Sequence, residues 1–173
     1  SLRDAAEAIW KDPTVWAGER APGGSLDAIL QDVEVSVNFA DRYLEDYHKG
    51  QVGQPEGYDE HGLVRNEIAA IHLYTMSIRG EHSRIFGALN AALRGGQENP
   101  QLVKPFFKWI RLLQHALLKL PPAPPSDTIF RAERPDDATT KEFLRTHKER
   151  GVFPLWGFSS CTLDAEVAET EYF

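Results

Sequence analysis

Apolar residues recur at intervals of three and four over most of residues 1–120, which is the spacing expected of amphipathic α-helices. In the longest such stretch, which follows the N-cap candidate Ser25, the residues on one helical face are Ile29, Val33, Val37, Ala40 and Leu44. Clusters of glycine and proline interrupt the pattern and mark loops. The sequence therefore predicts helices over residues 5–11, 25–49, 59–77, 83–94 and 105–120.

The pattern of the chain changes after the proline-rich stretch at 121–125. Residues 127–132 contain the Thr-Ile-Phe core of a strand, residues 139–150 return to helical spacing, and residues 151–162 suit an extended segment. Because two strands do not form a stable sheet alone, we expect further strands to follow residue 173 or to come from a second chain. The predicted fold class is α+β, with a mostly helical N-terminal part followed by the start of an incomplete β-core.

The composition is that of a folded globular protein, with 42% hydrophobic and 26% charged residues among 173. A net charge of −7 argues against general nucleic-acid binding, because phosphate contacts need clustered Lys and Arg. Cys161 is the only cysteine, which excludes an internal disulfide and a multi-cysteine zinc site. No apolar run approaches the roughly 20 residues of a membrane span, and no secretory signal precedes the first helix. We therefore expect a soluble protein without a nucleic-acid or membrane partner.

The common catalytic motifs are absent from the sequence. It contains no phosphate-binding loop of the GxxxxGK[ST] type, no GxGxxG, no HExxH and no GxSxG. The six histidines are scattered without an i, i+4 pair, so we expect no metal site.

The predicted helix over residues 105–120 combines an apolar stripe with basic residues. The stripe contains Phe106, Ile110, Leu113 and Leu117, with Phe107 and Leu118 beside it, and the basic residues are Lys108, Arg111 and Lys119. One interpretation is a helix that lies on a membrane surface. The other is a helix whose apolar stripe faces the protein core and whose basic face is in water. The acidic chain and the flanking helices favour the core-facing interpretation.

Three short segments carry side chains suited to a nucleotide. Asn90 and Arg94 lie four residues apart, so they share one helical face. An amide beside a guanidinium suits adenosine diphosphate, because the amide both donates and accepts while the guanidinium grips phosphate with two hydrogen bonds. Arg131 ends the apolar strand, and residues 157–162 (GFSSCT) place hydroxyl groups along an extended segment.

The order of these segments resembles the mono-ADP-ribosyltransferases of the arginine–serine–Glu-x-Glu class, which include clostridial toxins, C3-type exoenzymes and arginine-specific transferases. Tyr74-Thr75 and the run Asn90 to Arg94 (NAALR) are similar to the family's two helical motifs. The segment DTIFR, which ends in Arg131, is similar to its first signature strand. The resemblance spans about residues 64 to 168.

The second signature of that family is an aromatic-x-Ser-Thr-Ser segment, to which Phe158 to Thr162 (FSSCT) is similar. Cys161 replaces the middle Thr, and Thr162 replaces the last Ser. The resemblance implies an enzyme that cleaves the bond between nicotinamide and ribose in NAD and transfers ADP-ribose to a protein side chain. It implies catalytic roles for Arg131, which fixes the dinucleotide, and Ser160, which orients the catalytic glutamate. The implied NAD-binding residues are Tyr74, Asn90, Arg94, Arg131, Gly157 and Phe158.

The family's catalytic Glu-x-Glu segment lies some tens of residues beyond the serine segment. Glu169-Thr170-Glu171 spells this motif but follows Ser160 too closely, so we expect the catalytic glutamate beyond residue 173, in a tail or a second chain. The expected domains are a helical extension over residues 1–60 and the N-terminal part of a transferase domain over residues 61–173. Three alternatives remain: a catalytically silent NAD-binding relative, an NAD glycohydrolase, and a helical protein-interaction module that uses the helix at 105–120.

Overall fold

The computed structural model describes residues 1–12, 15, 26–49, 57–78, 81–82, 84–96, 98–122, 124, 128–130, 158 and 161–166. The chain divides into two compact units, Ser1–Pro121 and Pro122–Phe173. The division falls at the start of the proline-rich stretch, where the sequence pattern changes. The boundary proposed from sequence at residue 60 lies inside the first unit, whose early and late helices pack together.

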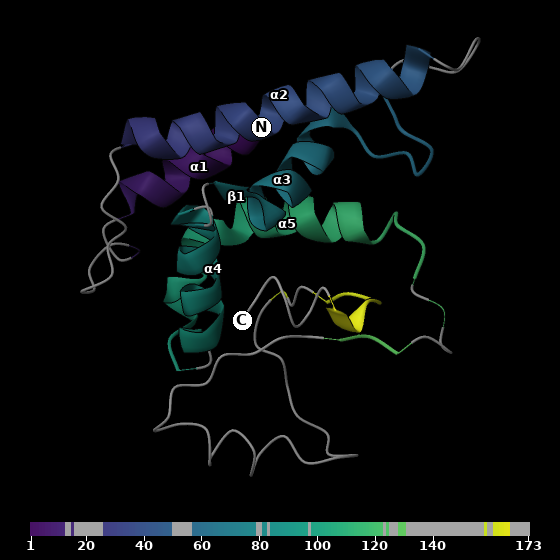
Figure 1. The fold of residues 1–173 in the computed structure, drawn as a ribbon. Coiled ribbons are helices and arrows are strands. Elements are labelled where there is room, and N and C mark those ends of the chain that lie inside the picture. The colour runs from purple at the N-terminus through teal and green to yellow at the C-terminus, as the bar shows by residue number, and fades with distance from the viewer. Residues whose placement is uncertain are drawn as a thin grey trace. The chain divides into compact units, whose positions relative to one another are not determined.

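The first unit is mostly helical, as the sequence predicts (Figure 1). Its helices within the described residues are α1 (Leu2–Lys11), α2 (Leu26–Lys49), α3 (Arg65–Thr75), α4 (Arg84–Gly95) and α5 (Phe107–Leu117). Strands β1 (Ser77–Ile78) and β2 (Glu81–His82) pair antiparallel between α3 and α4, with Ser77 opposite His82. Single 3-10 turns, Pro100–Leu102 and Lys104–Phe106, lead into α5. In Figure 1, α2 crosses the top of this unit, α3 and α5 lie below it, and α4 runs steeply downward.

The core of the first unit lies between α1, α2, α3 and α5. Four of the five apolar positions predicted to face inward on α2 are buried, namely Ile29, Val33, Ala40 and Leu44, whereas Val37 is half-buried. Two polar side chains on the same helix, Asp32 and Ser36, are also buried. The apolar pattern of α2 thus locates its inner face correctly but does not reveal the polar groups within it.

Helix α3 begins at Arg65, six residues later than the sequence predicts, because Asp59 folds a tight loop before it. The Asp59 carboxylate accepts hydrogen bonds from the backbone N–H groups of His61 (2.9 Å) and Leu63 (2.8 Å). Gly57 and Gly62 have φ angles of 96° and 72°, a region that L side chains rarely adopt. Side-chain bonds to the backbone of this kind compete with helix formation.

Helix α4 ends at its predicted glycine pair, but for a different reason. A left-handed C-cap requires positive φ, and among the described glycines only Gly57 and Gly62 have it. A Cβ on Gly96 would instead lie 2.5 Å from Val103 Cγ2 and 3.0 Å from the Ala92 carbonyl oxygen. Glycine is therefore required here because the following 3-10 turn packs closely against the helix end.

Helix α5 faces the core, which confirms the interpretation favoured by the sequence. Phe106, Trp109, Leu113 and Ala116 are buried. The prediction that Leu117 belongs to this stripe is wrong: Leu117 is exposed, because it is the last residue of α5 and the inner face is centred on Trp109, Leu113 and Ala116. No helix among the described residues is long and apolar enough to cross a membrane.

The described part of the second unit contains one isolated antiparallel bridge. Phe130 N donates to Thr162 O (2.8 Å), and Thr162 N donates to Phe130 O (2.9 Å). The bridge joins the two segments predicted to be strands, but the described residues form no β-core around it. The predicted helix over residues 139–150 lies outside the described part of the chain.

Candidate nucleotide-binding site

Two of the residues that the sequence singles out, Tyr74 and Asn90, contact each other. Tyr74 lies in the last turn of α3 and Asn90 in the middle of α4, and both side chains are buried. Asn90 Nδ2 donates to the Tyr74 hydroxyl at 3.2 Å, and that hydroxyl lies 3.5 Å from Asn90 Oδ1. The short β1–β2 hairpin between the helices lets these motifs, 16 residues apart, meet side by side.

An aromatic cluster fixes the position of Tyr74. Its ring meets Phe86 of α4 edge-to-face at a centroid distance of 4.9 Å and is tilted against Trp109 of α5 at 6.3 Å. Trp109 is itself anchored, because its indole N–H donates to the carbonyl oxygen of Ala70 at 3.4 Å. Edge-to-face pairs add stabilisation beyond burial of area. The Tyr74–Asn90 pair is therefore held by three helices, α3, α4 and α5.

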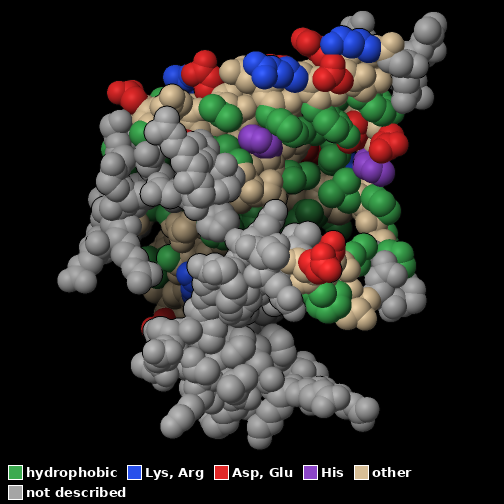
Figure 2. Space-filling model, viewed as in Figure 1, with side chains coloured by type: hydrophobic (Ala, Val, Ile, Leu, Met, Phe, Trp, Pro, Cys, Tyr) green, Lys and Arg blue, Asp and Glu red, His purple; other side chains and the backbone are tan. Residues whose placement is uncertain are grey.

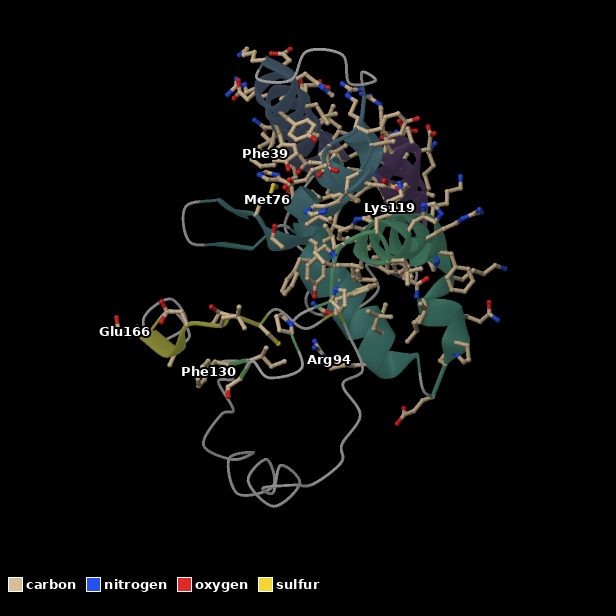
Figure 3. All side chains as sticks on the ribbon, turned by 90° about the vertical axis from the view of Figure 1, so that its right-hand side faces the viewer. Phe39, Met76, Arg94, Lys119, Phe130 and Glu166 are labelled. Atoms are coloured by element: carbon tan, nitrogen blue, oxygen red, sulfur yellow. The ribbon has the colours of Figure 1, made fainter. Side chains whose placement is uncertain are left out.

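Arg94 lies one turn beyond Asn90, in the last turn of α4, and its side chain is exposed (Figure 3). Within the described part of the chain its guanidinium forms no ion pair. A positive charge near a helix C-terminus interacts favourably with the helix dipole. An exposed guanidinium can grip a phosphate with two charge-assisted hydrogen bonds, whereas the Asn90 amide is 7% exposed and bonded to Tyr74.

The other predicted site residues belong to the second unit. Arg131, Gly157 and Ser160 lie outside the described residues, and Phe158 is half-buried. Phe130 and Thr162, whose backbones form the bridge, stand next to Arg131 and Cys161 in the sequence. The structure thus brings Tyr74 and Asn90 together and, among the described residues of the second unit, pairs Phe130 with Thr162.

Sequence reasoning missed a buried ionic cluster around Glu67. This carboxylate accepts hydrogen bonds from Lys119 Nζ (2.7 Å) and from Val64 N (3.0 Å), and His115 Nδ1 lies 2.9 Å from it. Burial raises the pKa of Glu67, but the hydrogen bonds from Lys119, Val64 and His115 outweigh it and hold the pKa below its ordinary value. Lys119 also donates to the carbonyl oxygen of Gly62 (2.9 Å), so the cluster ties α5 to α3 and to the preceding loop.

A second polar cluster lies between α2 and α3. The buried Ser36 hydroxyl is 3.1 Å from the Asp32 carbonyl oxygen and 3.0 Å from His72 Nδ1. The ring of His72 stacks on Phe39 at 4.1 Å, and burial lowers the pKa of this histidine. Figure 2 shows histidine and hydrophobic side chains beneath the charged edge formed by α2. Because Ser36 is fully buried, the pair is a structural contact and not an accessible nucleophile.

The partners in the two polar clusters are far apart in the sequence, so neither cluster as a whole can be recognised from composition or motif. Glu67 does have one sequence signal, because a Glu at the third helical position commonly reaches back to the N-cap backbone. Among the described residues, no group of three or more His, Cys, Asp or Glu side chains is placed to share a metal ion.

Comparisons of the chain with models of known families, with curated proteins and with solved structures find no match. The resemblance stated above therefore depends on the motif residues themselves and on where the structure places them.

Proposed function

We propose that residues 61–173 form the N-terminal part of the catalytic domain of an NAD-dependent mono-ADP-ribosyltransferase, which releases nicotinamide from NAD and transfers ADP-ribose to a side chain of an acceptor protein. The contact between Tyr74 and Asn90 carries the proposal. In the family that the sequence resembles, these residues belong to consecutive helical motifs that face one ligand. In this chain Tyr74 and Asn90 also touch each other, and this contact supports the assignment more strongly than the order of the motifs along the sequence.

The bridge between Phe130 and Thr162 is a second, independent support. It pairs the segment that ends in Arg131 with the segment that contains Ser160. The resemblance implies that the arginine fixes the dinucleotide and that the serine orients the catalytic glutamate, so both segments must reach one site. We propose that this bridge is the first pairing of a transferase β-core.

The proposed chemistry suits the residue types. Cleavage of the nicotinamide–ribose bond builds positive charge on the ribose, as in glycoside hydrolysis. Nicotinamide departs as a neutral molecule, so the site needs no strong acid. It needs groups that hold NAD in a reactive geometry and a carboxylate near the ribose. In this scheme Arg94 and Arg131 bind the phosphates, Asn90 contacts the nucleotide, Tyr74 positions Asn90, and Gly157 and Phe158 line the nicotinamide pocket. A glutamate beyond residue 173 supplies the carboxylate.

The first test is titration calorimetry of NAD into the chain as it stands. We expect saturable binding that Arg131→Ala abolishes and that Arg94→Ala weakens by about tenfold or more, since each removes a charge-assisted hydrogen bond to phosphate. Arg111→Ala is the matched control, because Arg111 is exposed on α5 and takes no part in the proposed site. Absence of NAD binding by the unsubstituted chain contradicts the proposal and favours an interaction module.

A second test separates the transferase from its alternatives. The chain, joined to any sequence that follows residue 173 in the natural protein, is incubated with NAD labelled in the adenylate. We expect label on a protein acceptor together with free nicotinamide. Free ADP-ribose without labelled protein would identify an NAD glycohydrolase instead. NAD binding without nicotinamide release would identify a silent relative.

A further inference from the structure

The basic residues in and beside α5 are separated along the sequence from the acidic residues of the chain. Residues 99–126 contain no Asp or Glu, although the whole chain carries 26 acidic and 19 basic residues. The same stretch contains Lys104, Lys108, Arg111 and Lys119. This segment therefore carries a positive charge, whereas the chain as a whole has a net charge of −7.

The structure uses only one of these four cations internally. Lys119 is bound to Glu67 and to the carbonyl oxygen of Gly62. Lys104, Lys108 and Arg111 are exposed, and within the described residues none of them forms an ion pair. Asp4 of α1 is close enough to feel the charge of Lys108, but its carboxylate is hydrogen-bonded to the amino group and hydroxyl of Ser1. The three cations therefore remain available to an external partner.

Two large apolar side chains accompany these cations. Phe107 is 58% exposed and Leu118 is 85% exposed. Within α5, Phe107, Lys108 and Arg111 lie on one side of the helix, opposite Trp109, Leu113 and Ala116 in the core. Lys104 lies in the 3-10 turn before α5 and Leu118 is its C-cap, and both are exposed. We call these five exposed residues the α5 outer face. A surface that combines free cations with exposed aromatic and aliphatic groups has the composition of a binding surface.

We propose that the α5 outer face docks an acidic segment of a partner protein, one in which Asp or Glu residues flank an apolar anchor. Phe107 and Leu118 contact the anchor, and the three cations pair with the carboxylates. Charge pairs at the rim of such an interface mainly accelerate association and select the partner, whereas the apolar contacts slow dissociation. The proposal does not depend on NAD binding.

Charge favours a protein partner over a membrane surface. Basic clusters that bind anionic lipids usually contain four to eight Lys or Arg residues, each worth about 1 kcal/mol near the surface. The α5 outer face offers three, and an anionic bilayer would repel the acidic surfaces of the remaining chain. An acidic peptide can contact this face alone and avoid that repulsion.

The test uses a display library of random peptides selected on the full chain. We expect the enriched peptides to be rich in Asp and Glu around Leu, Phe or Trp. Their affinity should fall by about tenfold or more in Lys104→Ala/Lys108→Ala/Arg111→Ala and in Phe107→Ser/Leu118→Ser, which corresponds to about 1.4 kcal/mol or more. The control is Lys11→Ala/Arg42→Ala/Lys49→Ala, which removes three exposed cations from α1 and α2 and should leave affinity unchanged.

All the substituted residues are exposed, so the variants should keep the circular dichroism spectrum of the original chain. Three results would overturn the proposal. One is that selected peptides show no acidic enrichment. Another is that the control and the α5 variants lose affinity equally. The last is that the chain binds vesicles containing phosphatidylserine through this face but binds none of the selected peptides. NAD affinity, measured in parallel, should be the same in all these variants, so failure here is distinguishable from failure of the proposed function.

Discussion

The ion pair between Lys119 and Glu67 offers a matched comparison with the pair between Lys49 and Asp46. In both, the ammonium nitrogen lies 2.7 Å from a carboxylate oxygen. The two pairs differ in burial, because the side chains are 28% and 4% exposed in the first and 71% and 73% exposed in the second. At equal geometry, any difference in their contribution to stability comes from solvent screening and from the additional bonds around Glu67.

We predict that Lys119→Met lowers the free energy of unfolding of the first unit by about 2–3 kcal/mol. A hydrogen bond to a charged group contributes about 1.5–3 kcal/mol, and breaking a fully buried pair costs about 3–5 kcal/mol. The expected loss of stability is smaller than that for a fully buried pair, because Lys119 is partly exposed and His115 remains beside the Glu67 carboxylate. Lys49→Met should change stability too little to be resolved, since exposed pairs contribute little.

The assay is urea denaturation followed by tryptophan fluorescence, with Trp109 buried in the first unit as the main reporter. A double-mutant cycle with Glu67→Gln isolates the pairwise term, which we expect to be about 1 kcal/mol or more. Equal losses of stability in Lys119→Met and Lys49→Met would refute the argument that burial makes the first pair important. A coupling energy near zero would refute the pairing itself.

Four further outcomes follow from the same structure. Because the pKa of Glu67 is lowered from 4.5, its contribution to stability is lost as pH falls through the folded-state value, and Glu67→Gln should flatten that acid limb in pH-dependent denaturation. Because burial lowers the pKa of His72 from 6.5, stability should begin to fall below about pH 6.5, and His72→Asn should remove that decline. Gly62→Ala should cost about 1 kcal/mol in urea denaturation, since the site has positive φ but open space around a Cβ. Trp109→Ala should cost about 3–5 kcal/mol and lower the melting temperature sharply, since the ring is buried among three helices.

The helices of the first unit were predictable because burial of one face imposes a period on the sequence. The stripe of α2 from Ile29 to Leu44 is of this kind. Boundaries were less predictable where a side chain competes with the helix, as Asp59 does before α3. The inner face of α5 was misplaced toward Leu117 because the predicted stripe left out Trp109 and Ala116, which are buried with Leu113.

The sequence indicated which residues could form the candidate site, but not which of them contact one another. Spacing placed Asn90 and Arg94 on one face of a helix, but no rule of spacing brings Tyr74 of another helix against Asn90. That contact depends on the reversal of the chain at the β1–β2 hairpin, which the sequence showed only as a break near residue 79. The ionic cluster at Glu67 depends in the same way on tertiary packing, because Lys119 is 52 residues away.

The bond between Tyr74 and Asn90 bears directly on whether this site can bind a nucleotide. A side-chain amide has two N–H donors and two lone pairs on its oxygen. The donation from Asn90 Nδ2 to the Tyr74 hydroxyl uses one of the two donors. One amide N–H donor is thus not used by this bond, and the amide is oriented by its bond to Tyr74, whose ring is held by Phe86 and Trp109. Fixing a polar group before binding reduces the entropy lost on association. Arg94, exposed one turn away, must still be ordered by the ligand. We therefore expect orientation of a nucleotide to depend mainly on Asn90, and its phosphate affinity mainly on Arg94.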